Sequence, residues 1–196
     1  MIAIVPTGGS NLGSVRAAFA RIGAETSVTE DPGEIAAASH VILPGVGHAA
    51  TMMRRLSARG LVETLRGLRQ PVLGICLGMQ LFFRSSEESN ADALPLLGLI
   101  PGAVRAIPPC GQIIPHMGWN VVAARARDPL AAKVDGRHLY FVHSYMADDG
   151  PWTVAVAEHG VAVPAVIRWG NLLGAQFHPE RSGEVGRNFL RGFLTS

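Results

Sequence analysis

A series of short, largely apolar runs in the first half of the chain most strongly constrains its fold. They lie at residues 2–5, 40–43 and 72–75, and segments with apolar residues at helical spacing, such as 49–56 and 61–68, separate them. A strand that is apolar at successive positions is buried on both faces, which is typical of a parallel sheet covered by helices. We therefore predict a mostly parallel sheet with helices on both faces.

The second half of the chain has a different character. Strand-like runs follow one another closely and are joined by turns that contain Gly, Pro or Asp, which is typical of antiparallel hairpins. These runs lie at residues 104–107, 119–123, 139–142, 152–158, 163–169 and 172–176. A final helix is predicted at 185–194. We expect a three-layer α/β fold with an antiparallel extension to the sheet, in one domain over residues 1–196.

Composition excludes several classes of protein. Of the 196 residues, 48% are hydrophobic and 16% are charged, as in a globular chain and unlike a disordered one. No apolar run reaches the roughly 18 residues of a membrane span, and the start lacks the basic segment of a signal peptide, so we expect a cytoplasmic protein. The net charge is +2 and the arginines are scattered, with Lys133 the one lysine, so nucleic acid is not the expected partner.

The sequence contains no recognisable metal or nucleotide motif. Its two cysteines, Cys76 and Cys110, form no C-x-x-C pair, and the seven histidines show no metal-binding spacing. The glycine-rich segment 8–13 fits neither the dinucleotide fingerprint nor the P-loop. We therefore expect no metal and no cofactor, and chemistry that is carried by side chains.

Cys76 lies in the pattern G-I-C-L-G at residues 74–78, where a buried strand meets a predicted helix. This is the nucleophile-elbow pattern with cysteine in place of serine. The flanking glycines allow the strand and the helix to approach each other, and the positive end of the helix favours a thiolate. The alternative is a buried structural cysteine between two packing glycines.

A candidate base lies near the C-terminus, in Q-F-H-P-E at residues 176–180. Pro179 disfavours a helical conformation at His178, so His178 and Glu180 are expected on the same side of an extended segment. A thiol nucleophile needs a base, and the base needs a group that fixes its tautomer. We therefore predict that Cys76, His178 and Glu180 form a catalytic triad; the alternative is an exposed turn.

Together these motifs resemble the class I glutamine amidotransferases. The resemblance is carried by G-I-C-L-G-M-Q at 74–80 and Q-F-H-P-E at 176–180. Within the family, the chain is most similar to the glutaminase subunits of imidazole glycerol phosphate synthases of histidine biosynthesis. That subgroup is indicated by P-G-V-G at 44–47, P-H-M-G-W-N at 115–120 and Y-F-V-H-S-Y at 140–145. The resemblance implies a flavodoxin-like form of the three-layer fold.

The resemblance also implies roles for other residues. The backbone N–H groups that would hold the oxyanion lie at Val46, Gly47 and Leu77. The residues that would bind glutamine are Gly45, Gln80, His143, Ser144 and Tyr145. The residues that would face a partner subunit are Asn11, Met117, Trp119 and Arg181. Plainer alternatives are an ordinary turn at 44–47, a core-edge glutamine at position 80 and core packing for Trp119.

Two segments depart from the family pattern. The family usually begins with a motif like Y-G-x-G-N-L, whereas residues 7–12 read T-G-G-S-N-L. After H-P-E the family commonly has lysine, where this chain has Arg181. Arginine keeps the charge but replaces a compact ammonium with a planar fork.

The activity implied by the resemblance is hydrolysis of L-glutamine to glutamate and ammonia. A (β/α)8-barrel cyclase, joined with this chain in a heterodimer, would receive the ammonia and make imidazole glycerol phosphate and aminoimidazole carboxamide ribotide. One alternative is a glutaminase of another pathway, such as anthranilate, guanylate or pyridoxal phosphate synthesis. Another is a non-catalytic binding or regulatory member of the same fold. A cysteine peptidase or γ-glutamyl hydrolase is a weaker third.

Overall fold

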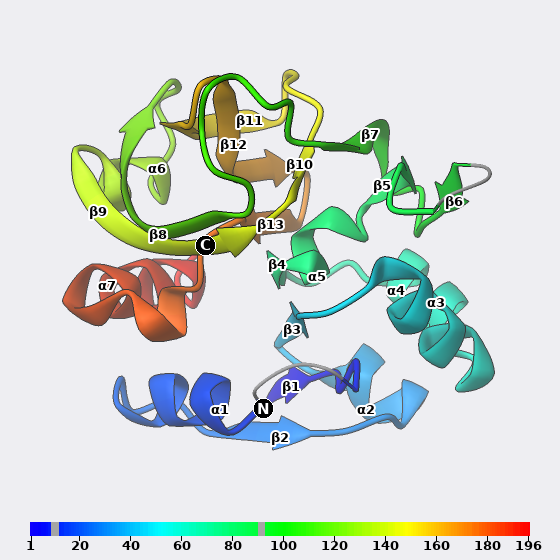
Figure 1. Cartoon of the computed structure of the whole chain (residues 1–196). Helices are drawn as coiled ribbons and strands as arrows, with labels where there is room; N and C mark the ends of the chain where they lie inside the picture. The colour runs from blue at the N-terminus through cyan, green and yellow to red at the C-terminus, as the bar shows by residue number, and fades with distance from the viewer. Residues whose placement is uncertain (9–11, 90–92) are drawn as a thin grey trace.

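A computed structural model describes residues 1–8, 12–89 and 93–196, and its main feature is a nine-stranded mixed sheet (Figure 1). In spatial order the strands are β2 (Thr26–Val28), β1 (Ile2–Ile4), β3 (His40–Gly45), β4 (Val72–Cys76), β13 (Leu172–Ala175), β12 (Ala162–Trp169), β11 (Thr153–Glu158), β8 (His116–Ala124) and β9 (Arg137–His143).

The parallel half of the sheet follows the prediction. Strand β1 pairs in parallel with β2 and β3, β3 with β4, and β4 with β13. Strand β2 was not anticipated, because its three residues include no buried side chain and form no apolar run. In the β4–β13 pair Ile75 lies opposite Ala175, so Cys76 and the segment that begins at Gln176 leave the sheet at the same edge.

The predicted antiparallel extension is also present. Strands β12, β11, β8 and β9 add to β13 as successive antiparallel neighbours. In the β8–β9 pair His116 lies opposite His143, which brings two of the sequence motifs together. The extension thus ends beside the edge of the sheet that carries Cys76.

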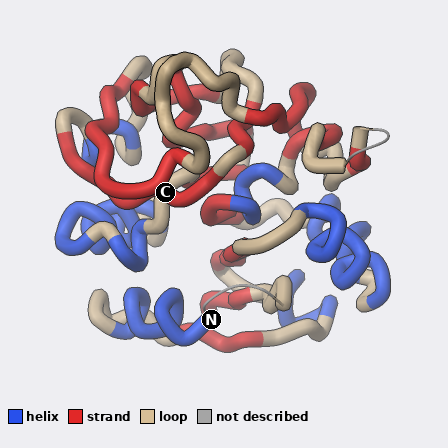
Figure 2. The backbone as a smooth tube through the Cα atoms, viewed as in Figure 1, coloured by secondary structure: helices blue, strands red, loops and turns tan. Residues whose placement is uncertain are grey.

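Helices cover both faces, which confirms the three-layer architecture (Figures 1 and 2). Helices α1 (Leu12–Ala20), α6 (Ala131–Val134) and α7 (Gly183–Phe193) pack on one apolar cluster. Helices α2 (Pro32–Ala37), α3 (Ala49–Ala58) and α4 (Leu61–Gly67) pack on the other. Among the described residues, no helix combines the length and apolar character that crossing a membrane requires.

A second, four-stranded sheet differs from the prediction. Its strands, in spatial order, are β10 (Tyr145–Ala147), β7 (Ile100–Ala106), β5 (Phe83–Ser86) and β6 (Leu94–Pro95). The run at 104–107 was expected in the main sheet but lies mostly in β7. The helix expected at 77–83 is the short α5 (Leu77–Gln80), and Phe83 already begins β5. Residues 81–83 are all buried, so their apolar character alone could not distinguish helix from strand.

Candidate active site

Cys76 lies at the junction of β4 and α5 in a strained backbone conformation. Its φ of 53° and ψ of −113° make it the one non-glycine residue with positive φ in the described chain. A Cβ atom at Gly78 would lie 1.7 Å from the carbonyl oxygen of Leu43, and one at Gly74 would lie 2.6 Å from the backbone nitrogen of Met79. The glycines on either side of Cys76 therefore permit backbone contacts that no other residue allows.

The sulfur of Cys76 is buried among polar groups. The side-chain amide nitrogen of Gln176 donates to Sγ over 3.6 Å, and the S–H can donate to the carbonyl oxygen of Val142 over 3.9 Å. Helix α5 contains only four residues, so its dipole is weaker than that of the longer helix expected from the sequence.

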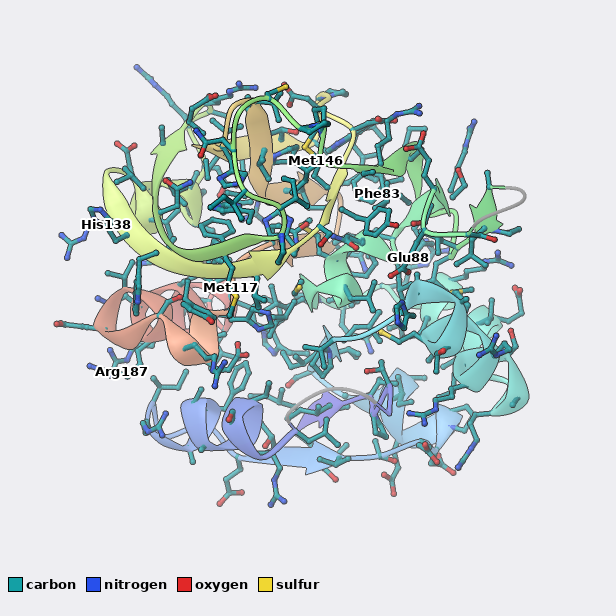
Figure 3. All side chains as sticks on the ribbon, viewed as in Figure 1. Phe83, Glu88, Met117, His138, Met146 and Arg187 are labelled. Carbon is teal, nitrogen blue, oxygen red and sulfur yellow. The ribbon has the colours of Figure 1, made fainter. Side chains whose placement is uncertain are left out.

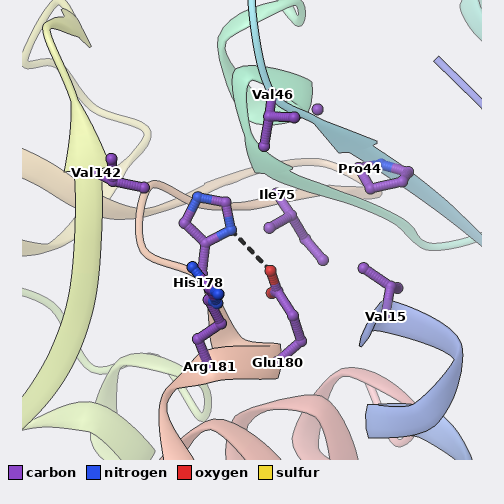
Figure 4. Close-up of a pocket in the computed structure, with 9 residues that line it drawn as sticks. Val15, Pro44, Val46, Ile75, Val142, His178, Glu180 and Arg181 are labelled. Carbon is purple, nitrogen blue, oxygen red and sulfur yellow. Dashed lines mark hydrogen bonds and ion pairs between the residues drawn. The ribbon is translucent and has the colours of Figure 1, made fainter. Parts of the chain in front are cut away.

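His178 and Glu180 form a buried pair beside this junction. His178 Nδ1 lies 2.8 Å from Glu180 Oε1. The dashed line in Figure 4 marks this contact. The pairing arises because His178 is extended while Pro179–Arg181 form a 3-10 turn, η1, which brings the carboxylate back to the imidazole. His178 Nε2 and Glu180 Oε2 are buried and have no hydrogen-bond partner among the described residues.

Two neighbours determine the charge of His178. Burial alone would lower its pKa, but the Cys76 side chain and the Glu180 carboxylate outweigh that effect and raise the pKa to about 10. His178 Nε2 makes no hydrogen bond with Sγ in this arrangement, so the influence of Cys76 reflects proximity and not a formed bond. The imidazole is therefore protonated near neutral pH and can stabilise negative charge on the sulfur.

A cavity of about 380 Å³ opens beside Cys76. This volume lies within the usual range for small-molecule sites. Its lining residues are Val46, Gly47, His48, Cys76, Leu77, Gln80, Glu88, Pro115, Val142, His143, Ser144 and Tyr145. The structure thus brings all the residues predicted to hold the oxyanion, and all those predicted to bind glutamine except Gly45, around the nucleophile.

A smaller cavity of about 130 Å³ lies on the His178 side (Figure 4). Its polar lining side chains are His178, Glu180 and Arg181, and the rest of the wall is apolar or glycine. Gly45 lines this cavity instead of the larger one. Val46 and Val142 line both cavities, so these two side chains stand between them.

A chain of neutral histidines supports one wall of the larger cavity. His143 Nδ1 lies 2.9 Å from the carbonyl oxygen of Tyr145, so this nitrogen carries the proton. His143 Nε2 then accepts from His116 Nδ1 at 2.9 Å, and His116 Nε2 accepts from Asn120 at 3.1 Å. Burial, helped by neighbouring imidazoles, lowers the pKa of His143 to about 3 and that of His116 to about 4.

The sequence analysis missed several residues of the site, and two of them, Glu88 and Gln176, have polar side chains at the cavity and at the sulfur. Glu88, which is labelled in Figure 3, lines the larger cavity. It accepts hydrogen bonds from the backbone N–H of Ala49 and from His48. It lies in the polar stretch S-S-E-E-S-N, which looks like an exposed loop. Gln176 was quoted only as part of a motif, and nothing in the sequence indicates that its amide reaches Cys76.

The residues predicted to face a partner lie on one surface, apart from Asn11, which is outside the described residues along with Gly9 and Ser10. Met117 is 67% exposed and Trp119 is 57% exposed, and both project from β8. Arg181 lies over the ring of Tyr140, 5.6 Å from its centre, and that ring meets Trp119 edge-on. The core-packing alternative for Trp119 is therefore wrong.

Comparisons with known proteins identify the family of this chain. Residues 4–195 match the family described as glutamine amidotransferase class-I. The chain is 48% identical over 194 residues to the imidazole glycerol phosphate synthase subunit HisH of Pasteurella multocida, which covers 98% of this chain and 96% of the relative. It is 49% identical over 195 residues to the HisH subunit of Xanthomonas axonopodis pv. citri, with the same coverage of both chains.

Solved structures show the same fold at low sequence identity. A glutamine amidotransferase crystal structure superimposes with a TM-score of 0.72 at 17% identity and covers 98% of each chain. A glutamine amidotransferase from Thermotoga maritima gives a TM-score of 0.65 at 15% identity, covering 98% of this chain and 95% of the other. The fold, the family match and the two relatives agree, and the chain belongs to the class I glutamine amidotransferase family.

Proposed function

We propose that this chain is the glutaminase subunit of imidazole glycerol phosphate synthase. It hydrolyses L-glutamine to glutamate and ammonia, and the ammonia serves a cyclase subunit. The observation that carries the proposal is the strained Cys76, which lies beside the buried His178–Glu180 pair and opens onto a cavity of substrate size. The identity of 48% to a HisH subunit over nearly the whole chain supports this member of the family.

The reaction begins with attack of the Cys76 thiolate on the carboxamide carbon of glutamine. The carbonyl oxygen becomes an oxyanion, and His178 gives its proton to the departing nitrogen, so ammonia leaves and a glutamyl thioester remains. Neutral His178 then takes a proton from water, and the resulting hydroxide cleaves the thioester to glutamate and thiolate. Glu180 holds the imidazole through Nδ1 and stabilises its charge.

The oxyanion is held by backbone N–H groups of the two segments that flank the sulfur. Leu77 is the first residue of α5, whose leading N–H groups have no acceptor within the helix. Val46 and Gly47 follow β3, whose Gly45 pairs with Cys76, and line the same cavity; Gly47 has a φ of 94° that favours glycine. Each such donor is expected to lower the barrier by about 3 kcal/mol.

Glutamine recognition follows from the charges of the cavity wall. Glu88 supplies a carboxylate for the α-ammonium group of the substrate. Both amide hydrogens of Gln80 are donated inside the protein, to the Tyr145 carbonyl and to Gln176, which leaves its carbonyl oxygen for the same ammonium. Ser144 and Tyr145 line the same cavity and bind the amino-acid end of glutamine.

A (β/α)8-barrel cyclase subunit binds the exposed surface around β8 and forms a heterodimer with this chain. Exposed Met117, Trp119 and Val121 occupy alternate positions of β8 and thus share one face of the strand. Such an apolar row on a soluble protein marks an interaction surface. The smaller cavity, with Arg181 at its wall, provides the route by which ammonia leaves toward that partner.

The chain acts as a single domain over residues 1–196 in the cytoplasm. The family match spans residues 4–195 without interruption, which supports one domain. The HisH relatives are bacterial subunits of a biosynthetic enzyme, which supports a cytoplasmic location.

The experiment that tests this function is Cys76→Ala, measured in the complex with the cyclase subunit and its ribotide substrate. Glutamine-driven synthesis should fall by at least about a thousandfold, because the nucleophile is lost. Synthesis driven by added ammonium should persist, because the cyclase is unchanged. The matched control is Cys110→Ala, which removes an exposed free cysteine and should leave both rates intact.

Two results would contradict the proposal in different ways. Glutamine use that survives Cys76→Ala would exclude Cys76 as the nucleophile. If the wild-type chain hydrolyses glutamine but neither binds the cyclase nor supplies it with ammonia, the glutaminase activity stands. Its assignment to this synthase is then rejected.

A further inference from the structure

The side chain of Gln176 connects the nucleophile to the interior of the protein. Gln176 is fully buried just after β13 and lies outside the lining of the glutamine cavity. Its Nε2 donates to the sulfur of Cys76 over 3.6 Å, and its Oε1 accepts from Nε2 of Gln80 over 2.9 Å. The reacting atom is therefore in contact with an amide that solvent does not reach.

The orientation of this amide is fixed by a backbone carbonyl. Nε2 of Gln80 also donates to the carbonyl oxygen of Tyr145 over 2.8 Å, and a carbonyl oxygen can only accept. The nitrogen of Gln80 must therefore face Tyr145 and Gln176, so Gln176 presents its oxygen to Gln80 and its N–H to the sulfur. His143 Nδ1 donates to the same carbonyl at 2.9 Å and helps to hold it in place.

An N–H donor at this position favours one charge state of the sulfur. A thiolate accepts hydrogen bonds strongly, whereas a thiol accepts them weakly, so the contact from Gln176 stabilises the thiolate. Cys76 is only 5% exposed and Gln176 is fully buried, so water is a poor substitute for this donor. The four-residue α5 contributes less dipole than a full helix, which increases the weight of the specific donor.

We propose that Gln176 is a catalytic residue that stabilises the reactive thiolate of Cys76, and that Gln80 and the Tyr145 carbonyl position its amide for this task. The inference rests on Cys76 being the nucleophile of the proposed function. The thiolate would thus be stabilised by two groups: the buried amide of Gln176 and the imidazole of His178, which lines the smaller cavity.

Other titratable groups also face the sulfur and must be kept constant. These groups are His178, Glu180 and Arg181 after β13, His143 on β9, Tyr145 on β10, His48 after β3 and Glu88 after β5. His143 is neutral near pH 7, because its pKa is lowered to about 3. Substitution at Gln176 leaves all of these residues in the chain, so a change in the pH profile of the sulfur reports the amide.

The test is the rate of alkylation of Cys76 by iodoacetamide from about pH 5 to about pH 10, in a Cys110→Ala background. Gln176→Met removes the donor and keeps the length of the side chain. The midpoint of the pH profile should rise by about one pH unit, which is about a tenfold lower rate below the midpoint. The plateau at high pH should match that of the unsubstituted chain, because the sulfur remains accessible.

The control is Gln112→Met, the same change at an exposed glutamine, which should leave the midpoint in place. If Gln176→Met fails to fold by circular dichroism, Gln176→Glu replaces it, since its shape is conserved and a carboxylate beside the sulfur should raise the midpoint further. In glutamine hydrolysis kcat should fall by a larger factor than KM rises, because the change acts directly on the sulfur and reaches the substrate only through Gln80, whose amide nitrogen donates to Gln176.

Two outcomes would overturn the inference. An unchanged midpoint in a folded variant would show that the amide does not stabilise the thiolate. A loss of rate that is equal at every pH would show that Gln176 only packs the site. An unsubstituted chain that cannot hydrolyse glutamine would reject the proposed function, whereas an unchanged midpoint beside normal glutamine hydrolysis would reject the inference alone, so the two failures are distinguishable.

Discussion

At the residue scale, the charge of His178 is the quantity on which the chemistry of the site depends. A histidine this buried would ordinarily be neutral, as His116 and His143 nearby are, because burial lowers their pKa values and no carboxylate raises them again. His178 differs because Glu180 and Cys76 lie against it and favour the imidazolium. Of the three buried histidines in this site, His178 is therefore charged, whereas His116 and His143 are neutral. The groups that contact each ring determine its charge.

Replacing Glu180 with glutamine should lower the pKa of His178 from about 10, because the imidazolium loses the carboxylate that stabilises it. The measurement is the titration of the His178 ring by NMR in the wild type and in Glu180→Gln. Glu184→Gln, at an exposed position of α7, is the control and should leave the titration unchanged. An unchanged midpoint in Glu180→Gln would show that Cys76 alone maintains the charge.

The site residues that the sequence analysis found lie in local sequence patterns, whereas those that it missed depend on contacts between distant parts of the chain. Cys76 and His178 lie in local patterns whose backbone requirements, two glycines and a proline, can be read from the chain. Gln176 and Glu88 act through contacts with residues 100 and 39 positions away, and those contacts depend on strand order and on a loop path. Sequence spacing contains no information of that kind.

At the scale of elements, the triad depends on how α7 supports η1. The helix packs against the 3-10 turn that holds Glu180, and the two approach so closely that a Cβ atom at Gly186 would lie 2.0 Å from the carbonyl oxygen of Pro179. A backbone atom cannot yield as a flexible side chain can. The position of the carboxylate is thus determined by a glycine in a different element.

Gly186→Ala should therefore displace η1 and lower kcat for glutamine by about a hundredfold, since a displacement of about 1 Å can have an effect of that size. The rate of glutamate release by the complex is the measurement. The control is Gly67→Ala in α4, where a Cβ atom would meet nothing within 4 Å, and alanine there should be neutral or slightly stabilising. Normal kcat in Gly186→Ala would show that η1 tolerates the shift.

The helices and strands could be predicted where the sequence has one clear pattern of apolar residues or turns. Buried parallel strands read as continuous apolar runs, and closely spaced turns indicate hairpins, so both halves of the main sheet were anticipated. The small sheet was not, because β5 and β7 are parallel and belong to a layer outside the main sheet. Apolar residues at 81–83 are compatible with helix or strand, and only their packing beneath that second sheet decides between them.

At the scale of the whole molecule, the row of exposed side chains on β8 should hold the cyclase subunit. Two valines of similar exposure give a matched comparison, because Val121 on β8 is 40% exposed and Val28 on β2, at the opposite end of the sheet order, is 38% exposed. An aspartate buried in an apolar interface is costly, because its charge loses water without gaining a partner. Val121→Asp should therefore weaken binding to the cyclase by at least about tenfold, and Val28→Asp should not.

The two variants also separate the interface from the catalytic site. Binding is measured by sedimentation of the two subunits, and alkylation of Cys76 in the isolated chain reports the site. We expect Val121→Asp to lose glutamine-driven synthesis while Cys76 reacts at its normal rate, because β8 is altered only on its exposed face. If both variants bind the cyclase as tightly as the wild type, the cyclase binds another surface of this chain. That result would also remove the argument that ammonia leaves past Arg181, since the smaller cavity would then open away from the subunit that uses it.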